Sequence, residues 1–367
     1  MSKLQPDTIL EALKTVNDPD LNRDLVSLNM IKDIKIHDND VLVVVELTTP
    51  ACPLKDKIKD DCIEAIKSNI PSIGKITIEM TAKVRANLDE RKNNILPGVK
   101  NTIAVASGKG GVGKSTVAVN ISVALAKLGA KVGLIDADIY GPSIPLMLGI
   151  KEKPRVFQDV QTAKMLPLEN FGIKVISIGF LIEDDAPVIW RGPMASGAIK
   201  QFMSDVHWDE LDYLIFDLPP GTGDIQLTLV QTIPLTGAVV VTTPQDVSLI
   251  DVRKAIRMFQ RVNVPILGIV ENMSYFIAPD TKKKYDIFGS GGGSKLADEL
   301  SLPLLGAIPI NPNIRIGGDD GKPIVFGEPD SDESLKILEI SKNLAAQISI
   351  NTLSVKTPKI DISLGEN

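Results

Sequence analysis

A glycine-rich run near residue 110 holds the residues of this 367-residue sequence that are best suited to chemistry. Its members are Gly108, Lys109, Gly110, Gly111, Val112, Gly113, Lys114, Ser115 and Thr116. The glycines let the backbone curl so that successive amide groups face phosphate oxygens. Lys114 is then placed to reach the β- and γ-phosphates, and the Ser115 hydroxyl to ligate Mg²⁺. The run therefore predicts a phosphate-binding loop for a nucleotide.

The flanking sequence predicts the strand and helix that such a loop requires. The apolar run 103–106 predicts a buried strand before the loop, and the apolar run 117–128 predicts a buried helix after it. A glycine-rich turn alone is usually only a turn, but strand, glycine loop, Lys-Ser and helix together are typical of nucleotide binding. The positive end of the helix dipole adds to the attraction for phosphate.

Carboxylates follow two other predicted strands. Strand 132–136 ends in Asp136 with Asp138 just beyond it, and strand 213–217 ends in Asp217. We expect Asp138 to orient a water for in-line attack on the γ-phosphate. Asp136 is expected to support Mg²⁺ or the loop, and Asp217 to hold Mg²⁺ through a water. The alternative for 136–143 is a capped turn, because Asp and Gly-Pro also form turns.

Two residues that follow later strands are candidates for binding the base. Asn272 follows strand 266–270, and its amide offers both a donor and an acceptor to the edge of adenine. Pro309 follows strand 305–308 and is a candidate for packing on the purine ring. Both residue types are also common in ordinary turns.

The pattern of apolar runs from residue 101 onward predicts an α/β fold. Short Val/Ile/Leu-rich strands alternate with helices, which is typical of a mostly parallel sheet covered by helices on both faces. The ligand site of such a sheet lies at the carboxyl ends of its strands. The predicted strands are 103–106, 132–136, 175–179, 213–217, 238–242, 266–270 and 305–308.

The rest of the chain divides around this domain, which we place at 101–348. Residues 1–85 predict a small α+β domain with the order helix, strand, strand, helix, strand. The polar stretch 86–100 is interpreted as a linker, and 349–367 as a flexible tail.

Composition narrows the functional classes. A net charge of −6 does not indicate the basic surface that is typical of nucleic-acid-binding proteins. No stretch is long and apolar enough to predict a membrane span. The two cysteines, Cys52 and Cys62, are too few for a disulfide framework, and the N-terminus lacks the apolar core of a signal peptide. A reducing, cytoplasmic setting is the expectation.

Lys109, a second lysine at the start of the loop, resembles the mark of the deviant P-loop ATPases that include MinD and ParA. In that set the lysine crosses a dimer interface to the partner's nucleotide. Residues 101 to about 345 resemble the Mrp/ApbC family of iron–sulfur cluster carriers, and 1–85 resemble the PaaD-like domain often fused to it. The matching strings are 105–116, 136–143, 190–194, 217–224, 270–276 and 317–323.

This resemblance implies a homodimeric ATPase that binds ATP with Mg²⁺ and passes iron–sulfur clusters to apo-proteins. Many family members carry Cys-x-x-Cys where this chain has Ala278 and Thr281, so the family's cluster ligands are not carried over. Cys52 is then the candidate cluster ligand, since a helix N-terminus and nearby lysines would lower the pKa of its thiol. The alternative for Cys52 is a small buried hydrophobic residue. Cys62 is interpreted as a small buried residue.

Two other functions stay open at this point. A MinD- or ParA-like positioning ATPase would need an amphipathic membrane-binding end or a basic DNA-binding face. A nitrogenase-iron-protein-like reductase would need cysteines in the ATPase domain, and residues 101–367 contain none. ATP hydrolysis is expected to be slow, because no catalytic arginine is identifiable.

Overall fold

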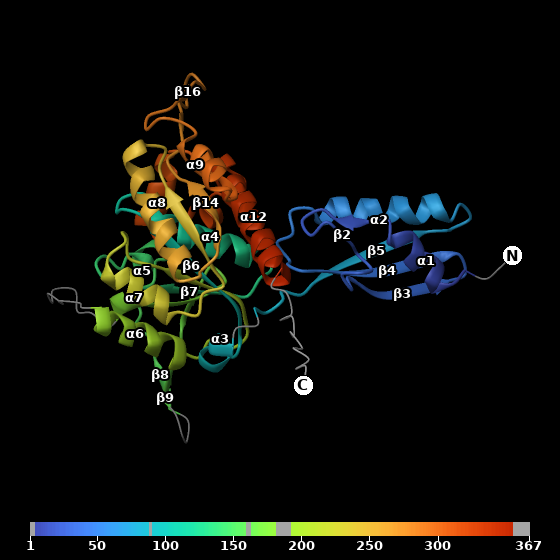
Figure 1. Ribbon diagram of the computed structural model, residues 1–367, viewed down its shortest axis with the longest axis horizontal. Coiled ribbons are helices and arrows are strands. Elements are labelled where there is room, and N and C mark those ends of the chain that lie inside the picture. The colour runs from blue at the N-terminus through green and yellow to red at the C-terminus, as the bar shows by residue number, and fades with distance from the viewer. Residues whose placement is uncertain (1–3, 88–89, 159–162, 181–191, 355–367) are drawn as a thin grey trace, which may run out of the picture.

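The computed structural model describes residues 4–87, 90–158, 163–180 and 192–354. Figure 1 shows a small N-terminal module (blue) beside a larger α/β body, with the end of the C-terminal helix (red) next to their junction. No helix in the described ranges is both long enough and apolar enough to cross a bilayer.

An eight-stranded sheet forms the centre of the α/β body, with the order β10-β11-β7-β12-β6-β13-β14-β17. Every neighbouring pair is parallel except β10 with β11. All seven predicted strands are present, although β6 begins four residues earlier than expected and β11 and β12 each begin two residues earlier. The strands are β6 (Val99–Ser107), β7 (Val132–Asp136), β10 (Leu168–Asn170), β11 (Ile173–Ser177), β12 (Leu211–Asp217), β13 (Gly237–Thr242), β14 (Ile266–Glu271) and β17 (Leu304–Ala307).

Helices cover both faces of this sheet, as the alternating pattern predicts. The central strands are buried throughout because apolar side chains on each face meet a helical layer. One face packs against α4 (Lys114–Lys127), α5 (Ile144–Met147), α11 (Ile324–Gly327) and α12 (Asp332–Ser354). The other packs against α6 (Gly192–Ser204), α7 (Asp224–Thr232), α8 (Asp246–Arg261) and α9 (Gly292–Leu300).

Smaller elements lie at the edges of the body. A short 3-10 helix, η1 (Ile178–Phe180), follows β11, and α10 (Pro312–Asp319) follows β17. Two short antiparallel pairs project from the body: β8 (Val156–Gln158) with β9 (Ala163–Met165), and β15 (Phe276–Ile277) with β16 (Lys284–Tyr285).

The N-terminal module has the predicted order of elements and one additional two-residue strand pair. Alternate residues of β4 are buried, which places one face of its three-stranded sheet against the helices. Its elements are α1 (Pro6–Leu13), β1 (Asn17–Asp18), β2 (Arg23–Asp24), β3 (Ile31–His37), β4 (Asp40–Leu47), α2 (Lys55–Asn69) and β5 (Ile76–Ala82).

The stretch interpreted as a polar linker is ordered over most of its length. It contains the short helix α3 (Glu90–Ile95), and β6 already begins at Val99. Lys92 is fully buried, and its ammonium donates 2.5 Å hydrogen bonds to the carbonyls of Asn87 and Lys100. The linker prediction for 86–100, which rested on polar composition, is wrong for most of this stretch. A buried lysine that donates to backbone carbonyls stabilises folded structure, although its residue type is polar.

The loop before α2 joins the N-terminal module to the sheet. Thr49 and Tyr213 are both buried, and their hydroxyls lie 3.0 Å apart. Ala51 and Val84 belong to the same apolar core as α4 and α12. This loop therefore meets β12 in the half of the strand that is remote from its carboxyl end.

The prediction of a flexible tail from residue 349 is wrong for residues 349–354. The domain was expected to end at residue 348, but α12 continues to Ser354 and includes the start of the predicted tail. Residues 349–353 are partly buried on this helix, so they are not the free tail that was expected. Residues 355–367 lie outside the described residues.

Candidate nucleotide site

The glycine-rich loop connects the carboxyl end of β6 to the start of α4, as predicted. Gly111 and Gly113 have φ of +78° and +79°, a conformation that favours glycine. A side-chain carbon at Gly108 would lie 2.3 Å from the backbone of Asp251, so the loop also packs closely against α8. Two independent geometric demands thus explain glycines in this run.

Four predicted residues, Lys114, Ser115, Asp138 and Asp217, meet at the first turn of α4. The Lys114 ammonium lies 2.7 Å from Asp217 Oδ1 and 3.3 Å from Asp138 Oδ2. The Ser115 hydroxyl donates a 2.6 Å hydrogen bond to Asp217 Oδ2. The carboxyl ends of β7 and β12 therefore bring their acids to the base of the loop.

Burial governs the protonation of this cluster. It raises the pKa of Asp217 above the ordinary aspartate value, although Lys114 and Ser115 act in the opposite direction. Burial also disfavours the charged form of Lys114, but Asp217 and Asp138 outweigh it and the pKa of the ammonium is raised. Lys114 thus stays positively charged and is available to an incoming anion.

Asp136 is directed at the neighbouring loop. Its carboxylate accepts hydrogen bonds from the Ser177 hydroxyl at 2.8 Å and from the amides of Asp138 and Ile144 at 3.2 Å. Complete burial, followed by repulsion from Asp217, raises its pKa well above the usual range. These contacts agree with the loop-supporting half of its predicted role, and its contribution to Mg²⁺ stays a prediction.

Asn272 braces the phosphate loop, a contact that the sequence did not indicate. Its side-chain amide donates a 2.9 Å hydrogen bond to the carbonyl of Val112. A side-chain carbon at Gly113 would lie 2.2 Å from the same amide nitrogen, so the two residues fit closely. Pro309 is buried after β17, and the adenine contacts of both residues remain predictions.

Lys109 is half-buried at the start of the loop. The Ser107 hydroxyl donates to its backbone carbonyl at 2.9 Å. Among the described residues its ammonium makes no ion pair, which leaves it available for an anion outside the chain. Residues 190 and 191 of the family-like string 190–194 lie outside the described residues.

The expectation of a reactive Cys52 thiolate is wrong for this conformation. Burial is the main cause that raises the pKa of this thiol to about 11, and nearby Asp20 and Asp18 add to the effect. The lysines of α2 do not offset it, and the cation that acts on Cys52 is Lys342 of α12. Cys62 is fully buried, and its raised pKa of about 12 agrees with a structural role.

This burial predicts slow alkylation of Cys52. With a pKa of about 11, the thiol is almost entirely neutral at pH 8, and its reaction with iodoacetamide is expected to be about 100-fold slower than that of an ordinary cysteine. The rate should rise as the pH approaches the pKa. Mass spectrometry of a Cys62→Ala variant checks this, because only Cys52 then reacts. A rate equal to that of free glutathione would contradict the burial seen here.

Comparison with known proteins agrees with this geometry. The family described as NUBPL iron-transfer P-loop NTPase matches residues 98–345, and an iron-sulfur cluster assembly protein family matches residues 6–80. The iron-sulfur cluster carrier protein of Synechocystis sp. is 51% identical over 354 residues, which cover 95% of this chain and 99% of that protein. The protein of the same name from Deinococcus radiodurans is also 51% identical, over 95% of this chain and 97% of its own.

A solved structure is similar to the α/β body. The nucleotide-binding protein of Archaeoglobus fulgidus, solved in complex with ADP, is 40% identical with a TM-score of 0.57. The match covers 65% of this chain and 93% of that one. The family match and the long, closely related sequences lead to one conclusion: the chain belongs to the NUBPL-type family of iron-transfer P-loop NTPases.

Proposed function

We propose that this protein binds ATP with Mg²⁺, hydrolyses it slowly and carries iron–sulfur clusters to apo-proteins as a homodimer. The contact of Lys114 and Ser115 with Asp217 is the observation that carries the nucleotide part of this proposal. It places a charged ammonium, a hydroxyl and a carboxylate where a phosphate and its metal ion would be held. The relatives that match over nearly their whole length are named iron-sulfur cluster carrier proteins, which supports an iron–sulfur cluster as the cargo.

The donor set at this site fits Mg²⁺. Ser115 Oγ, in the first turn of α4, and the Asp217 carboxylate, at the end of β12, are adjacent hard oxygen donors. When bound, the ion would neutralise negative charge on the phosphate oxygens. Lys114 would exchange its contact with Asp217 for the β- and γ-phosphates. The loop amides and the helix N-terminus would orient the same phosphates.

We assign the orientation of the attacking water to Asp138. Its Oδ2 lies 3.3 Å from the Lys114 ammonium, and its Oδ1 accepts a 3.2 Å hydrogen bond from the Tyr140 amide. These two contacts hold the carboxylate beside the group that would bind the γ-phosphate. A carboxylate in this position would accept a hydrogen bond from a water and orient it for attack.

The surface around the phosphate loop supports a homodimer. Four large apolar side chains are exposed in the segments that follow the carboxyl ends of β7 and β13. Tyr140, Leu146, Val247 and Ile250 are 68%, 63%, 66% and 55% exposed. Exposed apolar groups gathered at a functional face indicate a covered surface. A second copy facing this edge would cover them and bring the partner subunit's Lys109 toward the nucleotide.

We therefore expect Val247→Asp combined with Ile250→Asp to weaken ATP-dependent dimerisation by at least about tenfold, because closure would bury two unpaired charges. Both side chains are exposed in one protomer, so its fold should be unaffected. Sedimentation velocity with Mg-ATP provides the measurement. Val156→Asp is the matched control, because Val156 is 65% exposed on β8. Equal dimer affinity in the double variant and the control would place the interface elsewhere.

The position of Cys52 limits how a cluster can be held. Pro50 lies against Gly129, just beyond the far end of α4 from the phosphate loop. A helix of 14 residues is about 21 Å long, so Cys52 and the loop lie at opposite ends of the body. Two copies that face each other across their loops would keep their Cys52 thiols apart. We therefore propose that Cys52, once client binding frees its thiol from the partly buried position seen here, holds a cluster together with thiolates of the client protein.

Anaerobic reconstitution with iron and sulfide tests the cargo. The expected result is that wild-type protein gains a cluster absorbance with an added thiol and passes the cluster to an apo-protein, while Cys52→Ala does neither. Cys62→Ala is the control for loss of a thiol, and it should retain at least partial transfer if its core still folds. Absence of any cluster transfer by the wild-type protein would refute the carrier function.

A further inference from the structure

A groove of about 490 Å³ lies at the edge of the body opposite the nucleotide site. It is formed by the loops that precede β13 and β14, and therefore lies at the amino ends of these strands. Its apolar lining consists of Val230, Ile233, Leu235, Val262 and Val264. A second copy that meets the phosphate-loop face would leave this groove open.

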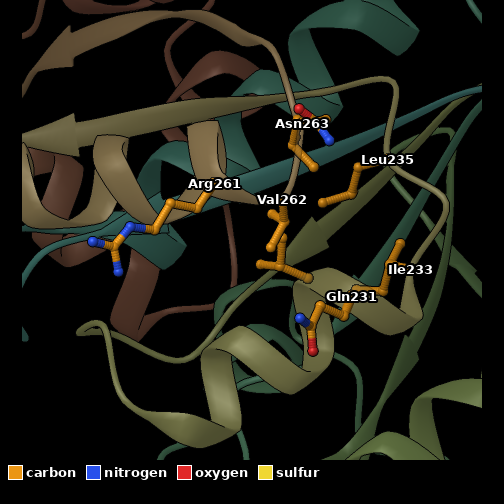
Figure 2. Close-up of a pocket in the computed structure, with 8 residues that line it drawn as sticks. Gln231, Ile233, Leu235, Arg261, Val262 and Asn263 are labelled. Carbon is orange, nitrogen blue, oxygen red and sulfur yellow. The ribbon is translucent and has the colours of Figure 1, made fainter.

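Polar side chains surround the apolar floor of the groove. Gln231, at the end of α7, and Asn263, just after α8, are exposed at its rim. Figure 2 shows the Arg261 side chain extending away from Val262 and Leu235, so that its guanidinium points out of the groove. An occupant could thus place an apolar group on the floor and an acidic group on Arg261.

A row of cations on α8 leads into this groove. Lys254, Arg257 and Arg261 are exposed and lie three and four residues apart, so they share one face of the helix. Lys254 pairs with Asp251 of its own helix at 3.1 Å. In the part of the chain that the structure describes, Arg257 and Arg261 have no ion-pair partner. This face is positive on a chain whose net charge is −6.

We propose that this groove and the outer face of α8 dock an acidic, partly apolar segment of the apo-protein client. The inference rests on the carrier function proposed above and identifies where the client binds. Two unpaired guanidinium groups match carboxylates, and the apolar floor accepts a side chain of the same segment. Three cations are too few for a nucleic-acid footprint, and the row is about 10 Å long, as a peptide segment requires.

The location of Cys52 supports this assignment. Thr49 reaches β12 at Tyr213, remote from the carboxyl end of that strand, and Pro50 contacts the turn that precedes β7. Cys52 therefore lies toward the amino edge of the same sheet that carries the groove. The groove and Cys52 thus share the edge remote from the nucleotide, although α8 covers one face of the sheet and the loop of Cys52 lies with α4 and α12 on the other.

The test measures binding of an acidic plant-type apo-ferredoxin to the full-length protein by calorimetry. Arg257→Glu combined with Arg261→Glu is expected to weaken binding by at least about tenfold at low ionic strength, and less at high salt. Gln231→Trp should block the groove and weaken binding at either salt concentration. The control is Lys200→Glu with Lys295→Glu, which makes the same charge change at exposed lysines of α6 and α9.

The assignment is supported if both groove variants lose affinity while the control variant and ATP turnover stay unchanged. It is overturned if wild-type protein does not bind apo-ferredoxin, or if the control variant loses as much affinity as the arginine variant. A change in dimer affinity of the arginine variant would also overturn it, by making this face a contact between copies. Binding without cluster transfer would instead refute the carrier function and leave the docking surface in place.

Discussion

Replacing Lys114 by alanine is expected to weaken binding of Mg-ATP by at least about 100-fold, which corresponds to about 3 kcal/mol. The ammonium is the charged donor at the base of the loop, and its present partners, Asp217 and Asp138, are acids. Without it, the phosphates would meet two carboxylates with no intervening positive charge. Calorimetric titration with Mg-ATP measures the effect.

The same change also removes the partner of a buried carboxylate, so stability must be measured in parallel. Thermal unfolding of Lys114→Ala and of Lys114→Gln would show whether the fold survives. Lys127→Ala is the matched control, since Lys127 is exposed at the other end of the same helix. If a folded Lys114 variant bound ATP within about threefold of the control, the loop would not be the phosphate site.

Replacing Asp138 by alanine is expected to leave ATP binding within about threefold of wild type and to lower the turnover rate by about 100- to 1,000-fold. The carboxylate contacts Lys114 from the side at 3.3 Å, whereas Asp217 makes the closer 2.7 Å contact. Its loss therefore leaves the main ion pair in place and removes the group that would orient water. Phosphate release under single-turnover conditions measures the chemical step directly.

Asp138→Asn separates the carboxylate charge from the fold of this loop. An asparagine keeps an oxygen that can accept the Tyr140 amide hydrogen bond, so the backbone should keep its course. Its amide is a far weaker base, so turnover should fall nearly as far as with alanine. Normal turnover in the asparagine variant would assign the water-orienting role to another residue.

The nucleotide site was predictable because each of its parts follows a local pattern. Gly111 and Gly113 require a conformation that favours glycine, and Asp217 follows the apolar run 213–216 of β12. Parallel strands align their carboxyl ends, so acids that follow separate strands converge without further information. Local sequence patterns were therefore enough to predict the strands and the helices that cover them. They were also enough to predict that Lys114 and Asp217 lie at the same site.

Contacts between distant segments were not predictable. The pairing of Asn272 with Val112 spans 160 positions in the chain and depends on how close β14 comes to the loop. Cys52 has the sequence context of an accessible thiol, yet the docking of its loop partly buries it. The ordered structure around Lys92 was missed for the same reason. Its ammonium donates hydrogen bonds to two backbone carbonyls, and the sequence does not show that these carbonyls lie within reach.

A structure of the Asp138→Ala variant with Mg-ATP tests the central claim most directly, because this variant should retain its nucleotide. The expected structure is a closed dimer in which Lys114 has moved from Asp217 to the β- and γ-phosphates and the partner subunit's Lys109 contacts the same triphosphate. A monomer whose loop is empty, with Lys114 still on Asp217 at saturating ATP, would contradict the account.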